Sequence, residues 1–358
     1  MLVGQASNTS ALGQAEMQTD PWIIDTDMDL DDWLALLLAL GHSRADIRAV
    51  SVVGDGGNRC PDAALSALAI VELAGEGRHI PVACGEGFPV DGFHSMPTAW
   101  RDESNSANFD ALPAASGTLA PVDAVDLVTQ TLRDSDQPIS ILSLAPLSNL
   151  ARVFDQAPDV IPMVREIVIM GGAVHASGNV AVPGFPNLPP NYGAEWNVFL
   201  DPVAAAAVFT SGIPIRLVPI DATRHVPVSD HLTYTILEGI DTPAGRLAAQ
   251  ILEAVGAIPS FYLWDPLAAS VALDRDVCDY RMVPLTVNTT TSPEGWSYPG
   301  TAADFPQENW RGEPRRHFDA ATSGATEIDP DHGTWVVMCA WPNVVAFTDS
   351  LRHSLSNE

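Results

Sequence analysis

Short hydrophobic runs alternate with segments of helical periodicity along most of the chain. The runs predict buried strands over residues 22–24, 47–53, 80–83, 139–144, 167–170 and 215–219. The periodic segments between them predict helices over 33–40, 63–74, 122–133, 147–153 and 203–209. Strands that alternate with helices build a mostly parallel sheet. The pattern therefore predicts an α/β protein whose open sheet carries helices on both faces.

Polar and interrupted segments break this pattern in three places. Residues 85–117 are rich in Gly, Pro, Ser and Asn and predict a long loop, and 286–333 predict another after a strand near 282–287. The apolar pattern returns over 335–351. Residues 1–20 are polar, and we expect a disordered extension there. Because no interdomain linker is apparent, we expect a single domain over 21–358.

One stretch between the first strand and the first helix concentrates acidic side chains. It holds five carboxylates within eight residues, namely Asp25, Asp27, Asp29, Asp31 and Asp32. Open α/β sheets bind ligands at the carboxyl ends of their strands, and charges this close repel one another unless a cation neutralises them. Oxygen ligands suit Ca²⁺ or Mg²⁺. Helix capping by Asp31 and Asp32 is the simpler interpretation, but it explains only two of the five carboxylates.

Composition narrows the classes of partner. The formal net charge is −28 and all 17 basic residues are arginine, so we discount nucleic acid and anionic membranes as partners. No stretch is apolar and long enough to span a bilayer, and residues 1–20 lack the features of a signal peptide, so a cytoplasmic location is the default expectation. Four cysteines without paired metal-ligand spacing are expected to be reduced core residues: Cys60, Cys84, Cys278 and Cys339.

The acidic stretch also resembles a known family. Asp25, Asp27, Asp31 and Asp32 fit the motif Asp-x-Asp-x-x-x-Asp-Asp that opens the nucleoside hydrolases. Further segments resemble the family's motifs in the same order, at 142–149, 170–173, 178–180, 194–198 and 261–269. A strand followed by Asp-x-Asp also resembles haloacid-dehalogenase phosphatases. Those enzymes normally use a downstream lysine, and this sequence contains none.

The resemblance implies a calcium-dependent N-glycosidase with a Rossmann-like core and a nucleoside as its substrate. The implied calcium ligands are Asp27, Asp32, Asp265 and the main-chain carbonyl of Leu144, and Asp27 is also the implied general base. The implied ribose contacts are Asp31, Met170, Asn179, Glu195 and Asn197. The implied base contacts are Asp55, Trp100, Trp196 and Trp264. Asp25 would brace the loop through hydrogen bonds. Members of the family are often dimers or tetramers, so we expect a homodimer or homotetramer.

Several of these residues also have a purely local interpretation. Asp265 followed by Pro266 is a helix N-cap signal that would account for both residues. Glu195 and Asn197 alternate with apolar neighbours, so in an extended segment they would face one side together. Asp55 is flanked by glycines and could be an ordinary turn residue.

Two departures from the family pattern bear on the substrate. Trp264 stands where many pyrimidine-accepting members have His, and in this it resembles the purine-preferring inosine-adenosine-guanosine group. Asp29 stands where the family commonly has Gly or Asn, and its charge would repel a 5′-phosphate, so we expect nucleosides rather than nucleotides. The alternatives are a hydrolase of pyrimidine, mixed or other N-ribosides such as nicotinamide riboside, and a ligand-binding paralogue with little turnover.

Overall fold

The computed structural model describes residues 19–90, 96–182, 188–291 and 319–356, which form a nine-stranded sheet. The strands are β1 (Asp20–Thr26), β2 (Ala45–Val52), β3 (Val82–Cys84), β4 (Ile139–Ser143), β5 (Val164–Met170), β6 (Ile215–Val218), β7 (Cys278–Val287), β8 (Thr326–Ile328) and β9 (Thr334–Pro342). Their order across the sheet is β3-β2-β1-β4-β5-β6-β9-β7-β8. The strands from β3 to β9 in this order are parallel, whereas β7 pairs antiparallel with both β9 and β8. The predicted open, mostly parallel sheet is confirmed.

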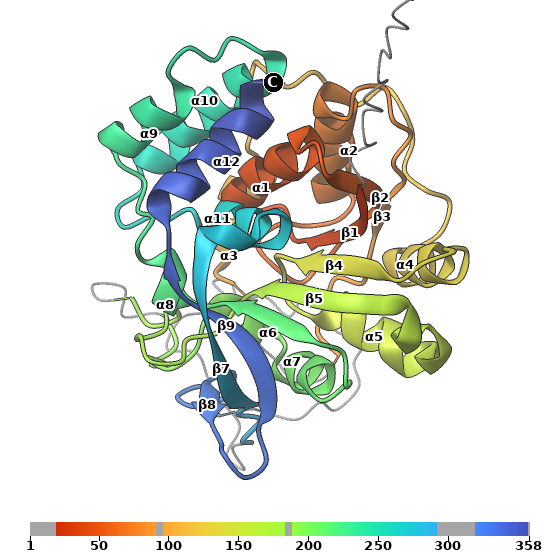
Figure 1. Ribbon diagram of the computed structural model, residues 1–358, viewed down its shortest axis with the longest axis vertical. Helices are drawn as coiled ribbons and strands as arrows, with labels where there is room; N and C mark the ends of the chain where they lie inside the picture. The colour runs from red at the N-terminus through yellow and green to blue at the C-terminus, as the bar shows by residue number, and fades with distance from the viewer. Residues whose placement is uncertain (1–18, 91–95, 183–187, 292–318, 357–358) are drawn as a thin grey trace, which may run out of the picture.

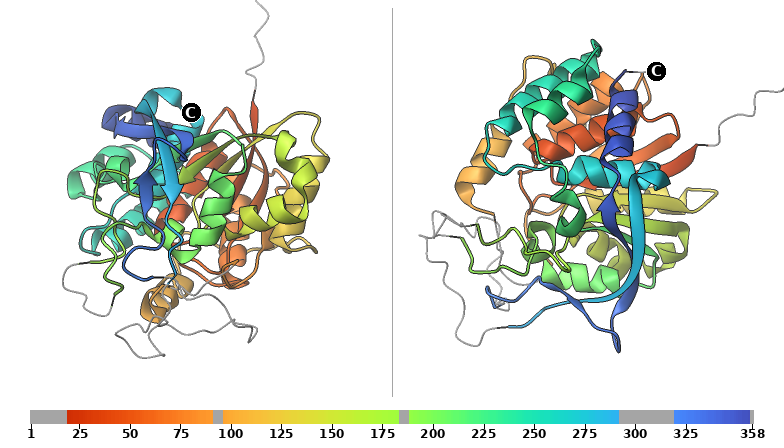
Figure 2. Two further views of the ribbon diagram at one scale, coloured as in Figure 1. Left: turned by 90° about the horizontal axis from the view of Figure 1, so that it is seen from below. Right: turned by 60° about the vertical axis from the view of Figure 1, so that its left-hand side comes forward.

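Helices cover both faces of this sheet (Figure 1). On one side lie α1 (Leu30–Gly41), α2 (Asp62–Ala74), α9 (Asp230–Leu237), α10 (Pro243–Gly256), α11 (Trp264–Leu273) and α12 (Val344–Ser356). On the other side lie α4 (Ala124–Arg133), α5 (Ser148–Gln156), the 3-10 helix η1 (Pro158–Met163) and α7 (Pro202–Phe209). In Figure 2 the teal and blue helices α10 and α12 lie across the sheet from the yellow-green α4 and α5. Shorter helices are α3 (Thr98–Asn105), α6 (Trp196–Leu200), α8 (Ile220–Thr223) and η2 (Arg275–Val277).

Two hydrophobic cores follow from the strand alternation. Ile24 and Val168 pack into the core beneath α1 and α11, while their neighbours Ile23 and Ile167 pack into the core beneath α4 and α5. Because successive strand residues point to opposite faces, a strand buried on both faces reads as a continuous apolar run. This is why the central strands were recognisable in the sequence. In the part of the chain that the structure describes, no helix is long and apolar enough to cross a membrane.

The strand order places a topological switch point between β1 and β4. From β1 the chain builds outward through β2 to β3, and it then returns to β4 on the other side of β1. The two connections leave on opposite faces, and sheets of this kind bind ligands outside the carboxyl ends of the strands at such a point. The acidic stretch after β1 lies at this point.

Two expectations about the outer parts of the chain were wrong. The predicted loop over 85–117 contains the helix α3, although residues 91–95 lie outside the described part. The cysteines are not reduced, because Cys60 is joined to Cys84 and Cys278 to Cys339. Cys278 and Cys339 lie on the antiparallel neighbours β7 and β9, and Cys60 lies in the segment before α2, next to the end of β3. Sequence spacing alone does not reveal either pairing. Most of the predicted extension over 1–20 lies outside the described residues, and β1 begins at Asp20.

Candidate active site

The acidic stretch turns sharply between β1 and α1. Met28 adopts a positive φ of 58° with its side chain fully buried in the core. Asp29 caps α1 by accepting a hydrogen bond from the Leu30 N–H at 2.8 Å. The turn leaves Asp27, Asp31 and Asp32 almost wholly buried. Burial of several carboxyl groups in one place is costly unless something compensates their charge.

A carboxyl group from a distant helix completes an acidic cluster. Asp265, in the first turn of α11, lies with Asp31 and Asp32, and one carboxylate oxygen of each lies within 4.8 Å of the others. The Asp265 N–H donates to Asp31 Oδ2 at 3.2 Å. The N-cap of α11 is Leu263, so the capping interpretation of Asp265 was wrong. Packing of α1 against α11 therefore brings these carboxylates together.

The cluster fits a hard divalent cation. Asp32 Oδ2 and Asp265 Oδ1 are buried without a hydrogen-bond partner among the described residues, whereas Asp32 Oδ1 accepts a hydrogen bond from the Thr26 hydroxyl. Orphaned carboxylate oxygens held at short separation are the ligands that Ca²⁺ and Mg²⁺ prefer. The charge of Asp27 acts on the Asp32 carboxyl group and raises its pKa, so Asp27 borders the same place. An acidic cluster that can bind a metal is thus present, formed by Asp31, Asp32 and Asp265.

The electrostatics agree with this interpretation. Burial, followed by the charges of Asp27 and Asp31, raises the pKa of Asp32 well above its ordinary value. Burial, followed by the charges of Asp31 and Asp32, does the same to the pKa of Asp265. Without a cation the cluster is therefore stable only with protons bound to part of it.

Asp27 is oriented by a second loop, which follows β2. The Gly57 N–H donates to Asp27 Oδ2 at 2.7 Å, and the Asp29 N–H donates to Asp27 Oδ1 at 3.3 Å. A Cβ atom at Gly56 would lie only 2.0 Å from Asp27 Oδ2, so this backbone approach requires glycine. Burial, and then the charge of Asp29, raises the pKa of Asp27 to about 6. These hydrogen bonds hold the Asp27 carboxylate in one orientation.

Asp25 points into the sheet and makes structural hydrogen bonds. It accepts from the Ser51 hydroxyl on β2 and from Asn149 Nδ2 on α5, the latter at 3.1 Å. These contacts tie the end of β1 to β2 and to α5. Burial is the main cause that raises the pKa of Asp25 to about 7.

Glu195 and Asn197 lie at the start of α6 and not in an extended segment, so the expected strand-like alternation was wrong. Glu195 caps this five-residue helix through the N–H groups of Asn197 and Val198, at 2.9 and 3.3 Å. Asn197 Nδ2 donates to the carbonyl oxygens of Leu144 and Met170, at 3.0 and 3.2 Å. These side-chain hydrogen bonds stabilise the start of a helix at a place where the alternating pattern indicated a strand.

With this geometry established, comparison with known proteins identifies the family. A family model described as inosine-uridine preferring nucleoside hydrolase matches residues 22–335. The chain belongs to this family. The pyrimidine-specific ribonucleoside hydrolase RihA of Shewanella baltica is 34% identical over 232 residues, which are 64% of this chain and 68% of that protein.

Solved structures of nucleoside hydrolases share the fold. The inosine-uridine preferring nucleoside hydrolase of Bacillus anthracis superposes with a TM-score of 0.74 at 22% identity, covering 95% of this chain and 100% of that one. The purine-preferring ribonucleoside hydrolase of Gardnerella vaginalis gives 0.69 at 20% identity, covering 94% and 98%. These relatives differ in the base that they are named for. The family therefore indicates a hydrolase acting on ribonucleosides without fixing the base.

The aromatic residues implied for base binding lie in two separate apolar groups of this nucleoside hydrolase. The Trp100 ring meets the Trp196 ring edge-on at 5.7 Å, beside Phe199. Trp264, at the first position of α11, meets the Phe261 ring edge-on at 4.9 Å. Asn179 Oδ1 accepts from the Trp196 N–H at 3.2 Å, which links the first group to the segment before α6.

Besides the acidic cluster, this nucleoside hydrolase has a buried pair of carboxyl groups, Asp55 and Asp201, that the sequence did not indicate as a pair. Ser148 Oγ lies 2.7 Å from Asp55 Oδ2 and 2.7 Å from Asp201 Oδ2. A hydroxyl has one proton to donate, so the second contact requires a proton on one of the carboxyl groups. Burial is the main cause that raises the pKa of Asp55 to about 6 and that of Asp201 to about 7. Asp201 caps α7 through the Ala204 N–H at 3.0 Å, and no local pattern indicates its approach to Asp55 through Ser148.

Proposed function

We propose that this nucleoside hydrolase cleaves the N-glycosidic bond of ribonucleosides with the help of Ca²⁺, favours purine nucleosides, and releases the free base and ribose. The observation that carries the proposal is the buried cluster of Asp31, Asp32 and Asp265 beside Asp27 at the switch point of the sheet. Its orphaned oxygens suit a divalent cation.

Four groups would hold the cation: the carboxylates of Asp27, Asp32 and Asp265 and the Leu144 carbonyl. Leu144 O already accepts a hydrogen bond from Asn197 Nδ2, but a carbonyl oxygen has two lone pairs, so one remains for a cation. When bound, the cation supplies Lewis-acid activation of a water molecule and a fixed positive charge near the sugar. Asp31 would bind ribose hydroxyl groups.

Asp27 would take a proton from the attacking water molecule. The water oxygen forms a bond to the anomeric carbon, the bond from that carbon to the base nitrogen breaks, and the electron pair leaves with the base, which then takes up a proton. The Gly57 N–H fixes the Asp27 carboxylate during this transfer. General-base catalysis of this kind contributes about 10²- to 10⁴-fold to the rate.

Purine preference is supported by the indole next to Asp265. Trp264 occupies the position where a pyrimidine-accepting site would hold a histidine acid, and Trp100 and Trp196 supply further aromatic surface. Stacking adds only about 0.5–1.5 kcal/mol beyond area burial, so it favours the larger ring system without replacing an acid.

A pyrimidine nucleoside hydrolase is the second candidate. It is favoured by the similarity to the pyrimidine-specific RihA of Shewanella baltica, at 34% identity.

One assay separates the two candidates and tests the metal. The protein is incubated with inosine, adenosine, guanosine, uridine and cytidine, with calcium or with excess chelator, and free ribose is measured. We expect release from the purine nucleosides that is lost on chelation and in Asp27→Asn but kept in Asp159→Asn, which alters an exposed ion pair with Arg133. Uridine or cytidine as the best substrate would replace the purine proposal with the second candidate. Release that survives thorough chelation would refute the role of the cation.

A further inference from the structure

The helix α3 contacts α6, the loop after β2 and the turn after β1, which carries the proposed base Asp27. Trp100 on α3 meets Trp196 of α6, Arg101 reaches the loop after β2, and the Ser104 hydroxyl donates to Asp29 Oδ1. A surface loop would not be expected to make such contacts. This arrangement suggests that α3 helps to hold the site together.

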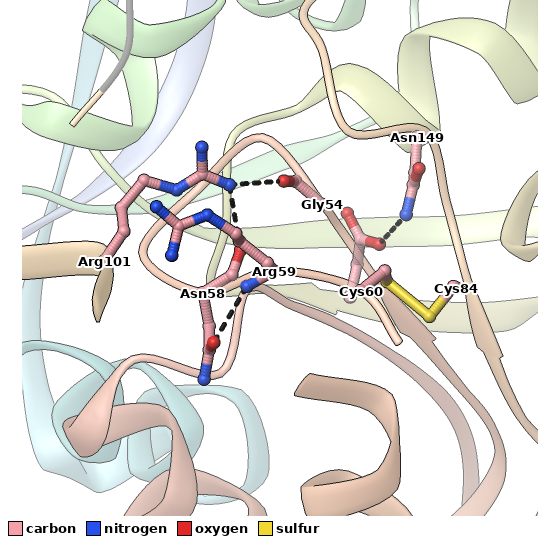
Figure 3. Close-up of a disulfide and its surroundings, with 8 residues drawn as sticks. Gly54, Asn58, Arg59, Cys60, Cys84, Arg101 and Asn149 are labelled. Carbon is pink, nitrogen blue, oxygen red and sulfur yellow. Dashed lines mark hydrogen bonds between the residues drawn. A yellow bond between two sulfur atoms is a disulfide. The ribbon is translucent and has the colours of Figure 1, made fainter. Parts of the chain in front are cut away.

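Arg101 makes the central contact of this group. Its side chain comes from α3 and is almost fully buried, with an exposed fraction of 3%. Arg101 Nη2 donates to the carbonyl oxygens of Gly54 and Asn58, at 2.8 and 3.3 Å, as Figure 3 shows. These carbonyls mark the two ends of the loop 54–58, so one guanidinium group bridges the loop. Burial of a guanidinium is expensive unless its hydrogen bonds are well made.

The bridged loop is the one that orients Asp27. Between the two carbonyls lies Gly57, whose N–H donates to Asp27 Oδ2 at 2.7 Å. Asn58 Nδ2 donates to the Met28 and Ser104 carbonyls, both at 3.3 Å, and so connects the loop to the turn after β1 and back to α3. The loop backbone packs directly against the turn after β1, since a Cβ at Gly56 would collide with Asp27 and a Cβ at Gly57 with Asp29. A displacement of the loop therefore displaces the hydrogen bond to Asp27.

The loop is held covalently just beyond Asn58. Cys60 is joined to Cys84, at the end of β3, and Figure 3 shows this bond on the far side of the loop from Arg101. The disulfide fixes where the loop leaves toward α2. Arg101 bridges the part that contains Gly57, which precedes the disulfide. The two restraints are thus not redundant.

We propose that Arg101 is a positioning residue that sets the orientation of the Asp27 carboxylate through the carbonyls of Gly54 and Asn58 and the N–H of Gly57. The role assigned to Asp27 rests on the proposed function. Arg101 itself touches neither substrate nor cation in this proposal. It keeps the loop in the one conformation that presents the Gly57 N–H to Asp27.

The test compares three variants by steady-state kinetics on the best nucleoside substrate and by hydrogen–deuterium exchange. Arg101→Met removes every donor and keeps the length of the side chain. Arg101→Lys keeps the charge and one donor group, which can serve only part of the bridge. Asp102→Asn is the control, because it breaks the ion pair of Asp102 with Arg59, which joins α3 to the residue directly after the loop.

We expect Arg101→Met to lower kcat about 10²-fold with KM changed less than about threefold, as for a misplaced catalytic group. Arg101→Lys should recover roughly tenfold of that loss. The exchange protection of peptide 54–60 should fall in Arg101→Met. In the control Asp102→Asn, both this protection and kcat should equal those of the wild-type protein. A general structural role would instead lower the folded fraction and leave kcat per folded molecule unchanged.

Two outcomes would overturn the proposal: unchanged kcat in a folded Arg101→Met, or unchanged exchange protection of peptide 54–60. If Arg101→Met does not fold, Arg101→Lys decides, and an undiminished kcat in that variant refutes the proposal. A wild-type protein that hydrolyses no nucleoside refutes the proposed function instead, and the exchange measurement then decides alone whether Arg101 holds the loop.

Discussion

Asp29 illustrates how one side chain can carry a structural and an electrostatic role together. Its Oδ1 accepts hydrogen bonds from the Leu30 N–H and from the Ser104 hydroxyl, so it caps α1 and ties this helix to α3. It is only half-buried, so its charge remains effective at the rim of the site. The capping role depends on an acceptor oxygen, whereas the proposed rejection of a 5′-phosphate depends on the negative charge.

Replacing Asp29 with Asn separates these two roles. Asn caps helices as well as Asp, so we expect the free energy of unfolding to change by less than about 0.5 kcal/mol. Loss of the charge should raise the turnover of inosine 5′-monophosphate relative to inosine by roughly 5- to 10-fold, equivalent to about 1 kcal/mol of repulsion. Ribose or ribose-phosphate release from the two substrates measures the ratio. Asp102→Asn removes an exposed charge nearby and should leave the ratio unchanged. An unchanged ratio in Asp29→Asn would show that its carboxylate does not face the 5′ position.

At this scale the sequence indicated the acidic stretch and, through the family's motifs, Asp265, but it did not indicate the other contacts between distant residues. Asp27 and Asp32 were recognisable because five carboxylates crowd one strand end, and Asp265 because its motif comes last in the family's order. The contact of Ser148 with Asp55 and Asp201 joins residues 93 and 53 positions apart. Nothing in the neighbourhood of each residue indicates such a partner, and the same holds for Arg101.

The sequence pattern did not predict the short helices α3 and α6, nor the helices α9 and α10. The sequence of α3, Thr-Ala-Trp-Arg-Asp-Glu-Ser-Asn, has no apolar stripe, and α6 has only five residues. Helices this short are unstable in isolation and form because tertiary contacts hold them. The central strands and the helices α1, α2, α4 and α5 were predictable because each carries a continuous or periodic apolar pattern. The cysteine bonds belong with the errors, since they depend on which strands become neighbours.

The two disulfides should contribute measurably to stability. Cys60–Cys84 closes a separation of 24 residues and Cys278–Cys339 one of 61. Constraining the unfolded chain in this way is worth about 2–4 kcal/mol for each bond. We expect Cys278→Ala/Cys339→Ala to lower the midpoint of urea unfolding while kcat is kept, because this pair joins β7 to β9, away from the carboxylates. Alkylation of the native and reduced protein followed by mass spectrometry checks the bonds directly.

Free thiols in the native, non-reduced protein would contradict this prediction, as would an unfolding midpoint that reduction leaves unchanged. Disulfides persist mainly in oxidising surroundings. Intact bonds in protein isolated without reductant would therefore favour such surroundings over the reducing cytoplasm expected by default.

For the molecule as a whole, the buried acids make stability depend on pH and on the cation together. Burial is the main cause that raises the pKa of Glu195 and Asp25 to about 7 and that of Asp27 to about 6, from ordinary values of 4.5 and 3.8. Between the ordinary and the raised values the folded protein binds more protons than the unfolded chain. Stability therefore falls as the pH rises through about 4 to 7, the reverse of the usual salt-bridged carboxylate.

A bound divalent cation should oppose this loss, because it binds the same carboxylates once their protons have left. We expect the melting temperature of the metal-free protein to fall between about pH 5 and pH 7.5, and added calcium to raise it more at pH 7.5 than at pH 5. Differential scanning calorimetry at fixed, high ionic strength measures both effects, since the net charge of −28 would otherwise add its own salt dependence. Asp32→Asn removes one ligand and should abolish the calcium increment, whereas Asp159→Asn should keep it. An increment of equal size at both pH values would mean that calcium binds elsewhere on the acidic surface, where protons do not compete with it.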